Sequence, residues 1–336
     1  MAFNSIGDLV QSFALQRQSN LLKQQIQRLT EELSTGVTTD VTKHLSGDFA
    51  DFSDVESKLV ILDSRRRIAE QGRVDSDVMQ KALERFQTQA QNLENIALGL
   101  GTSGTALSTG TFTKEARGVL EAMLSALNTG IGGRALFAGD DVGSSALSSF
   151  EDFMTSVRAS VTGAASASDL TAALDAFFDA PGGGFETFVY QGGSSARAAY
   201  PLGEGESVTL DLRADDPAFR AMLKQVTTAA LLDDPGVALS MSDKADLTAR
   251  VGTQLLIGQT ALTDIRAALG FAESRIDRAA TRISAEMSGL SMLRNNLLSI
   301  DPFEAATELE TVQLRLETLY TLTSRMSRLN LVNFLS

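Results

Sequence analysis

The sequence predicts a mainly α-helical fold with a small α+β insert, in which both chain ends contribute to a long antiparallel bundle of coiled-coil type. Apolar residues recur at heptad spacing near both ends of the 336-residue chain. The chain has five prolines, three tyrosines and no tryptophan, a composition that favours long helices over a pocket built from aromatic side chains. Between the helical parts, residues 139–241 form short pieces rich in Gly, Ser and Ala.

The first expected element is a helix in ALQRQSNLLKQQIQRLTEELSTG, which ends at Gly36. Its apolar seam steps by seven, four, three and four residues, which is heptad spacing. The seam consists of Leu15, Leu22, Ile26, Leu29 and Leu33.

Two further helices are expected before residue 139. The stretch DSDVMQKALERFQTQAQNLENIALG carries the clearest heptad seam, and KEARGVLEAMLSALN follows after a Gly/Ser/Thr loop. The first seam consists of Met79, Leu83, Phe86, Ala90, Leu93 and Ala97, and the second helix presents Ala116, Val119, Leu120, Met123, Leu124 and Leu127. We expect the second helix to pack back on the first.

The middle of the chain is predicted to be a separate α+β unit. SFEDFMTSVRASV and SDLTAALDAFFD are expected to be short helices, the latter ending before Pro181. FETFVYQ and ESVTLDLRA alternate apolar and polar residues, which predicts strands. Asp216 followed by Pro217 indicates the cap and first turn of another helix.

Long helical periodicity then returns at the C-terminal side. A seam from Ile265 to Leu297 is interrupted by one charged residue, Glu286. Asp301 and Pro302 indicate the start of a last helix. We therefore expect terminal helices at 1–45 and 298–336, a helical rod at 46–138 and 242–297, and a central α+β domain at 139–241.

Composition excludes several classes of function. A net charge of −13 argues against nucleic acid or an anionic membrane as the main partner. The absence of cysteine excludes disulfides, thiolate metal sites and a cysteine nucleophile. No run of apolar residues is long enough for a membrane span, and the N-terminus has no conventional secretory signal.

No catalytic, cofactor-binding or metal-binding residue is predicted, and the chain is not expected to be an enzyme. His44 is the only histidine and is expected to lie at the surface or in a cap. No G-x-S-x-G motif accompanies the serines, although a hydrolase with an unrecognised serine remains a remote alternative. Acidic doublets at 140–141, 215–216 and 233–234 could be metal ligands, but capping and turn formation explain them better.

The C-terminal run SRLNLVNFLS raises the question of what covers it. Burying its five large apolar side chains stabilises by roughly 8–15 kcal/mol, whereas ordering about ten terminal residues costs about 10–20 kcal/mol. These side chains cannot all share one helical face, so neighbouring subunits are the simplest cover. The expected assembly interface comprises Leu15, Leu22, Ile26, Leu29, Leu33, Leu309, Val312, Leu316, Leu319, Met326, Leu329, Leu331, Val332, Phe334 and Leu335. A second interpretation stays open, in which the seams close on each other within one chain as in a coiled-coil binding module.

Three segments resemble the bacterial flagellin superfamily. DPFEAATELETVQLRLETLYTLTSRMSRLNLVNFL resembles its C-terminal segment, with an ExxTEL-like helix and a terminal SxLxLxxFL pattern. QRLTEELSTG resembles its RLSTG-type helix end. NTGIGGRALFAGDD at 128–141 is similar to the N-x-x-x-x-G-R-Y-x-F-A-G segment of the subunits that join hook to filament, with Ala135 in place of the tyrosine. The resemblance covers roughly the first 140 and the last 90 residues.

Within the superfamily, the LFAG segment favours a junction subunit over filament flagellin. After its STG the chain has VTTDVTKHLSGDFADFSDVESKL, not a segment like INSAKDDAAGLAI as in filament flagellin. The resemblance implies no cofactor and a subunit that the flagellar type III apparatus exports unfolded, guarded by a chaperone at its C-terminal helix. It also implies a ring of copies outside the cell, between a hook-associated protein and flagellin, with terminal helices disordered in the monomer and the central domain facing outward.

Overall fold

The computed structural model describes the backbone of residues 4–100 and 106–335, and side chains over 10–100 and 109–326. The chain forms two compact units. The terminal unit consists of Met1–Asp63 and Ala285–Ser336, and the middle unit of Ser64–Ser284. The fold is mainly α-helical with two small antiparallel sheets, which confirms the predicted fold class.

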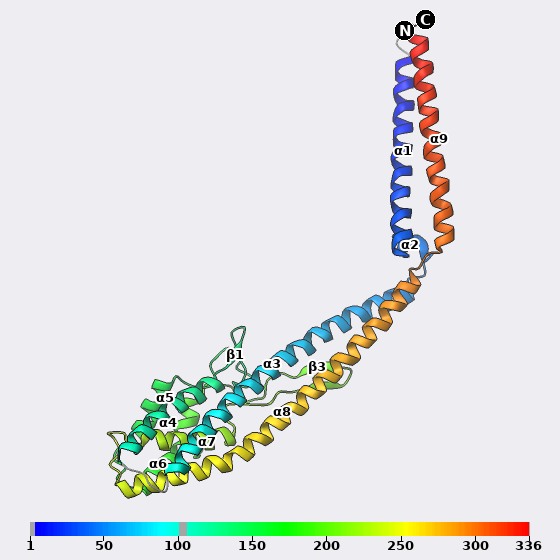
Figure 1. Cartoon of the computed structure of the whole chain (residues 1–336). Helices are drawn as coiled ribbons and strands as arrows, with labels where there is room; N and C mark the ends of the chain where they lie inside the picture. Colours follow the sequence, from blue (N-terminus) through cyan, green and yellow to red (C-terminus); the bar gives the residue numbers. More distant parts are fainter. Residues whose placement is uncertain (1–3, 101–105, 336) are drawn as a thin grey trace. The chain divides into compact units, whose positions relative to one another are not determined.

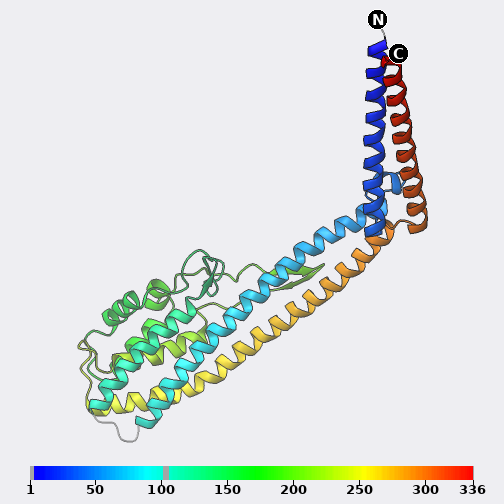
Figure 2. The ribbon, with the colours of Figure 1, turned by 45° about the horizontal axis from the view of Figure 1, so that its top comes forward.

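The terminal unit is built around two long helices, α1 (Asn4–Thr35) and α9 (Pro302–Leu335). They lie side by side along their length, so the N-terminal end of α1 and the C-terminal end of α9 share one end of the pair (Figures 1 and 2). Gly36 follows α1 with a φ of +72°, the left-handed conformation that ends helices. The Asp301 carboxylate accepts hydrogen bonds from the backbone N–H groups of Phe303 and Glu304, which confirms the predicted cap.

The C-terminal end of α1 lies beside the N-terminal end of α9, and backbone hydrogen bonds join the segment after α1 to the segment before α9. Val37 and Ser299 form an antiparallel bridge. The N–H of Ile300 donates to the Gly36 carbonyl at 3.1 Å, and the N–H of Thr38 donates to the Leu298 carbonyl at 2.9 Å. The short α2 (Val41–His44) follows this bridge and begins at Asp40, whose side chain caps it. The antiparallel helix pair is thus fixed at this end.

The middle unit has a continuous hydrophobic core between long helices. It contains most of α3 (Ala50–Leu100) and α8 (Met241–Leu297), together with α4 (Ala106–Leu127) and α7 (Pro217–Leu231). Every residue of the predicted seam from Met79 to Ala97 is fully buried, as are the predicted apolar residues of α4. Asp216 caps α7, and Pro217 lies in its first turn, as predicted.

Shorter elements complete the middle unit. They are the helices α5 (Phe150–Val161) and α6 (Ala167–Phe178), the one-turn π-helix η1 (Phe185–Val189), and two hairpins, β1 (Gly130–Ile131) with β2 (Arg134–Ala135) and β3 (Tyr200–Gly203) with β4 (Glu206–Val208). The β1–β2 turn uses Gly132 and Gly133 at positive φ. The predicted alternation in ESVTLDLRA matches burial of Val208 and Leu210, but only its first residues pair, as β4.

The prediction of a strand in FETFVYQ was wrong, because this segment is the π-helix η1. Phe185 and Val189 are buried, whereas Thr187 between them is exposed, so burial follows a helical spacing and not an alternating one. The Phe185 ring stacks on Phe178 of α6 with centroids 5.5 Å apart. Packing against α6 therefore overrides the strand propensity of the local sequence.

Candidate assembly interface

Eight of the residues expected to mediate assembly form one apolar cluster between α1 and α9. Four are buried, namely Leu22, Leu29, Val312 and Leu319, and four are half-buried, namely Leu15, Ile26, Leu309 and Leu316. The heptad spacing of both helices places these side chains on facing sides. The seams thus close on each other within one chain, the arrangement that the sequence left open.

The other expected interface residues lie toward the two ends of the pair. Leu33 is 37% exposed, and Met326 is half-buried, its sulfur accepting a long contact from Gln11 Nε2 at 3.9 Å. The side chains of the remaining five, Leu329, Leu331, Val332, Phe334 and Leu335, lie outside the described residues, although the backbone of α9 is helical as far as Leu335.

A buried carboxylate anchors the turn that follows α1. Glu32 is 4% exposed, and its Oε1 accepts from the backbone N–H and the hydroxyl of Thr39, each at 2.9 Å. Burial alone would raise the pKa of Glu32, but the hydrogen bonds from Thr39 and the charge of Arg28 outweigh it, and the pKa is lowered. Ionised Glu32 therefore stabilises the connection between α1 and α2.

A polar contact lies at the edge of the helix pair, closer to the two chain termini. Lys23 Nζ lies 5.9 Å from the centre of the Tyr320 ring. Hydrogen bonds involving Ser19 and Lys23 lower the pKa of the exposed Tyr320 hydroxyl. This contact sets the relative position of α1 and α9 along their axes.

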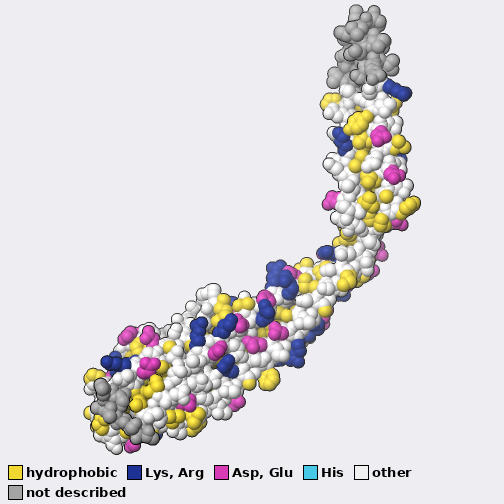
Figure 3. All heavy atoms as spheres, viewed as in Figure 1, with side chains coloured by type: hydrophobic (Ala, Val, Ile, Leu, Met, Phe, Trp, Pro, Cys, Tyr) yellow, Lys and Arg dark blue, Asp and Glu magenta, His cyan; other side chains and the backbone are white. Residues whose placement is uncertain are grey.

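Large apolar side chains also lie on the outside of the pair, and the sequence analysis missed them. On α1 these are Val10, Phe13 and Leu21, and on α9 they are Phe303, Leu314 and Leu322, each at least half exposed. Figure 3 shows apolar side chains along the visible surface of this pair. Large apolar side chains exposed along one element are one feature of surfaces that associate with other proteins. Val10 and Leu21 on α1, and Phe303 and Leu314 on α9, are each eleven residues apart, a spacing that places each pair on one helical face and could have revealed them.

The described residues contain no group of carboxylates or histidines arranged to hold a metal ion. The acidic doublets have local roles. Asp216 caps α7, Asp233 pairs with Lys244 at 2.9 Å, and the buried Asp234 pairs with Arg117 and Arg158. Capping, turns and ion pairs therefore explain the doublets at 215–216 and 233–234.

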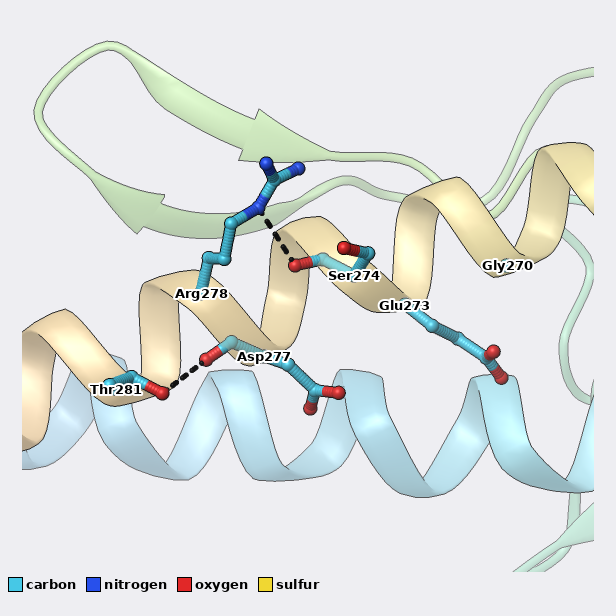
Figure 4. A pocket seen from close by; sticks show the side chains of 6 residues that line it. All are labelled: Gly270, Glu273, Ser274, Asp277, Arg278 and Thr281. Carbon is cyan, nitrogen blue, oxygen red and sulfur yellow. Dashed lines mark hydrogen bonds between the residues drawn. The ribbon is translucent and has the colours of Figure 1, made fainter.

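Two of the surface grooves contain side chains of the kinds found in reaction sites. One of about 460 Å³ runs along α8 beside Glu273, Ser274 and Asp277 (Figure 4). Burial, with the charges of Asp77 and Asp277, raises the pKa of Glu273. The other, of about 210 Å³, contains His44, and no serine is among its described lining residues. Neither groove brings a serine and a histidine together as a hydrolase requires.

The LFAG segment has an internal role in the middle unit. Residues Leu136, Phe137 and Ala138 are fully buried, and the Ala138 carbonyl accepts from the N–H of Gly193 at 2.8 Å. Gly139 has a φ of +62°, and a side chain there would meet the Gly193 carbonyl oxygen 2.9 Å away. The glycines of this segment and of 192–193 thus allow two loops to lie backbone against backbone.

A long helix pair made from both chain ends, with an apolar seam between its helices, is the arrangement of a helical structural protein. Residues 257–335 match the family model described as the bacterial flagellin C-terminal helical region. The C-terminal part of the chain is thus similar to the C-terminal helical region of bacterial flagellin, as its end segment indicated.

The fold is similar to a solved structure of a protein from Vibrio parahaemolyticus that is provisionally described as flagellar hook-associated. The TM-score is 0.53 at 14% sequence identity, covering 75% of this chain and 99% of the other. At this identity the likeness concerns the fold. Comparison with curated protein sequences gives no match. Within the described residues, no helix has the length and apolar character that crossing a membrane requires.

Proposed function

We propose that the chain is the adaptor at the hook–filament junction, hook-associated protein 3, and that it assembles through α1 and α9. One observation carries the assembly part of this proposal. The helix pair buries one seam internally, yet keeps Phe13, Leu314 and Phe303 at 70%, 64% and 82% exposure. Covering a large apolar side chain fully stabilises by about 1.5–3 kcal/mol, so adjacent subunits have a strong reason to pack here.

The narrow internal seam supports a second part of the proposal, that the terminal helices become fully ordered only on assembly. Between these helices of 32 and 34 residues, the apolar cluster has four buried side chains among those described. The stability of helices in proteins comes mostly from tertiary packing of an apolar face, and this pair has one narrow seam. We therefore propose that residues 1–45 and 298–336 are largely disordered in the monomer and become rigid between neighbours.

Two features support a junction adaptor over a filament flagellin. The LFAG segment with its Arg134 resembles that of junction subunits, and the fold is shared with a protein described as hook-associated. The partners would be copies of the chain in a ring, the adjacent hook-associated protein and flagellin, with an export chaperone on α9 before assembly. Export through the flagellar type III apparatus would place the chain outside the cell.

Filament flagellin is the second candidate, and the match of residues 257–335 to the flagellin C-terminal region favours it. Copy number and a deletion separate the two. A junction adaptor is needed in tens of copies, and its deletion should leave hooks intact while flagellin is released into the medium. A filament subunit is needed in thousands of copies, and its deletion should leave hooks without filaments and no flagellin in the medium.

A further inference from the structure

A second set of positions on α1 and α9 faces away from the internal seam. On α1 we define the outer stripe as Val10, Ala14, Arg17, Leu21, Gln24 and Arg28, and on α9 as Phe303, Thr307, Glu310, Leu314, Glu317 and Thr321. Both sets step by four, three, four, three and four residues, the spacing that keeps side chains on one helical face. Leu314 is two residues from Val312 and Leu316, so it lies about 200° around the helix from the seam.

The two outer stripes carry opposite charges. The stripe of α1 contains Arg17 and Arg28, and the stripe of α9 contains Glu310 and Glu317. Over the described part of the chain, Arg17, Glu310 and Glu317 make no ion pair, whereas Arg28 contacts Glu32 at 3.5 Å. Opposite charges on surfaces of equal periodicity favour contact between unlike stripes and oppose contact between like ones.

The threonines of the α9 stripe present an apolar surface. The Thr307 hydroxyl donates to the Phe303 carbonyl at 2.8 Å, and the Thr321 hydroxyl donates to the Glu317 carbonyl at 2.9 Å. With the hydroxyl hydrogens directed into their own helix, the side-chain methyl groups are available for packing. The stripe is therefore more apolar than its sequence indicates.

We propose that the outer stripe of α1 in one copy packs antiparallel on the outer stripe of α9 in the next copy. This inference rests on the proposed function and identifies the surfaces by which copies associate. One register places Leu21 opposite Leu314 and Arg17 opposite Glu317. Advancing four residues along α1 from Arg17 to Leu21 corresponds to moving three residues back along α9 from Glu317 to Leu314. Three residues further along α1, Gln24 lies opposite Glu310, which is four residues before Leu314 on α9.

This register is close to the one inside each chain. Within the chain, the contacts of Gln11 with Met326 and of Ser19 with Tyr320 place Arg17 near residues 320–322 of α9. In the proposed contact Arg17 lies opposite Glu317, an offset of about four residues or roughly 6 Å. Neighbouring copies at nearly the same axial position can therefore form both the internal seam and the contact between outer stripes. Because each copy offers two different stripes, the contact is head-to-tail and continues into a ring or a helix.

Charge reversal tests this contact in the full-length protein. We expect Arg17→Glu and Glu317→Arg each to weaken association by at least about tenfold, because like charges then face each other. The double variant should recover to within about threefold of the wild type. Arg315→Glu, on the same helix but outside the stripe, is the matched control and should associate like the wild type. Sedimentation velocity at a series of concentrations measures the effect.

The outcomes separate this inference from the proposed function. A wild-type chain that associates, together with an Arg17→Glu chain that associates equally well, overturns the stripe contact and leaves the adaptor function standing. A wild-type chain that remains monomeric at all concentrations overturns the stripe contact, whereas the deletion described above decides the adaptor function separately.

A disulfide cross-link tests the same contact by geometry, because the chain has no cysteine of its own. Oxidation of the variant carrying Leu21→Cys and Leu314→Cys should give a ladder of covalently linked multimers. Exclusively monomeric product would contradict the contact. Efficient dimers from either single-cysteine variant would indicate a two-fold contact between like stripes and would also overturn it.

Discussion

The two units of the chain differ in how completely they bury their own apolar surface. In the middle unit, the predicted seam from Met79 to Ala97 is enclosed by α4, α7 and α8 in one continuous core. In the terminal unit, two helices of comparable length share a narrow seam around Leu29 and Val312 and keep an apolar face outside. The same heptad spacing thus serves a self-contained core in one unit and, we propose, a surface for neighbours in the other.

The largest effect on stability is expected in the core of the middle unit. Phe86 is fully buried and meets Phe219 edge to face, with ring centroids 5.4 Å apart. Phe86→Ala should lower the free energy of unfolding by about 3–5 kcal/mol through lost burial and a cavity. Urea unfolding followed by circular dichroism measures this. A change below 1 kcal/mol would show that the middle unit is not a tightly packed core.

A similar effect is expected at a buried ionic cluster in the same unit. The fully buried Asp75 accepts from Arg197 at 3.0 Å and from the Tyr200 hydroxyl at 2.5 Å. Burial and this hydrogen bond raise the pKa of Tyr200 to about 12. Asp75→Ala should cost about 3–5 kcal/mol, because it leaves Arg197 buried without its partner.

The double variant Asp75→Leu, Arg197→Leu is the control for the Asp75 prediction. It removes both charges, so it should be more stable than Asp75→Ala. Denaturant midpoints of the two variants measure the difference. Equal destabilisation of both would mean that the loss comes from packing and not from the unpaired charge.

In the terminal unit the expected effects on folding are smaller and local. In the assembled protein, Leu29→Ala should cost about 2–3 kcal/mol and speed amide exchange in α1 and α9 without changing the middle unit. The matched control is Leu21→Ala on the outer stripe, where the change in monomer stability should be below about 0.5 kcal/mol although association weakens. If Leu21→Ala lowered the stability of the monomer by more than this, the outer stripe would have an internal partner.

The smallest effect concerns pH. Because the pKa of Glu32 is lowered in the folded chain, its contribution is present above the unfolded-state value, near 4.5, and is lost as pH falls through the folded-state pKa. In the assembled protein, the amides of the connection after α1, above all that of Thr39, should therefore lose protection on acidification. Glu32→Gln should make this local protection insensitive to pH over the same range. Protection of these amides that increases on acidification would contradict a lowered pKa of Glu32.

The heptad periodicity predicted the helices well, because apolar residues at this spacing form one buried helical face whatever surface they pack against. It could not tell which surface covers a seam. Leu22 and Val312 look alike in sequence whether they meet each other or a second chain. The heptad of Phe303, Leu314 and their stripe escaped notice because threonine and glutamate occupy four of its six positions.

Contacts between distant segments also lay beyond the sequence. Asp75 and Tyr200 are 125 residues apart, and no local pattern links them. The strand β3 was missed because it is four residues long and contains Pro201. FETFVYQ alternates like a strand, yet the stack of Phe185 on Phe178 holds it in a helical turn. In each case a tertiary contact decides the conformation.

Hydrogen exchange by mass spectrometry on the full chain, as monomer and as assembly, tests the central claim most directly. Our account predicts that amides of 4–35 and 302–335 exchange rapidly in the monomer and slow by orders of magnitude on assembly, whereas most amides of 64–284 do not change. Strong and equal protection of both terminal helices in the isolated monomer would contradict it.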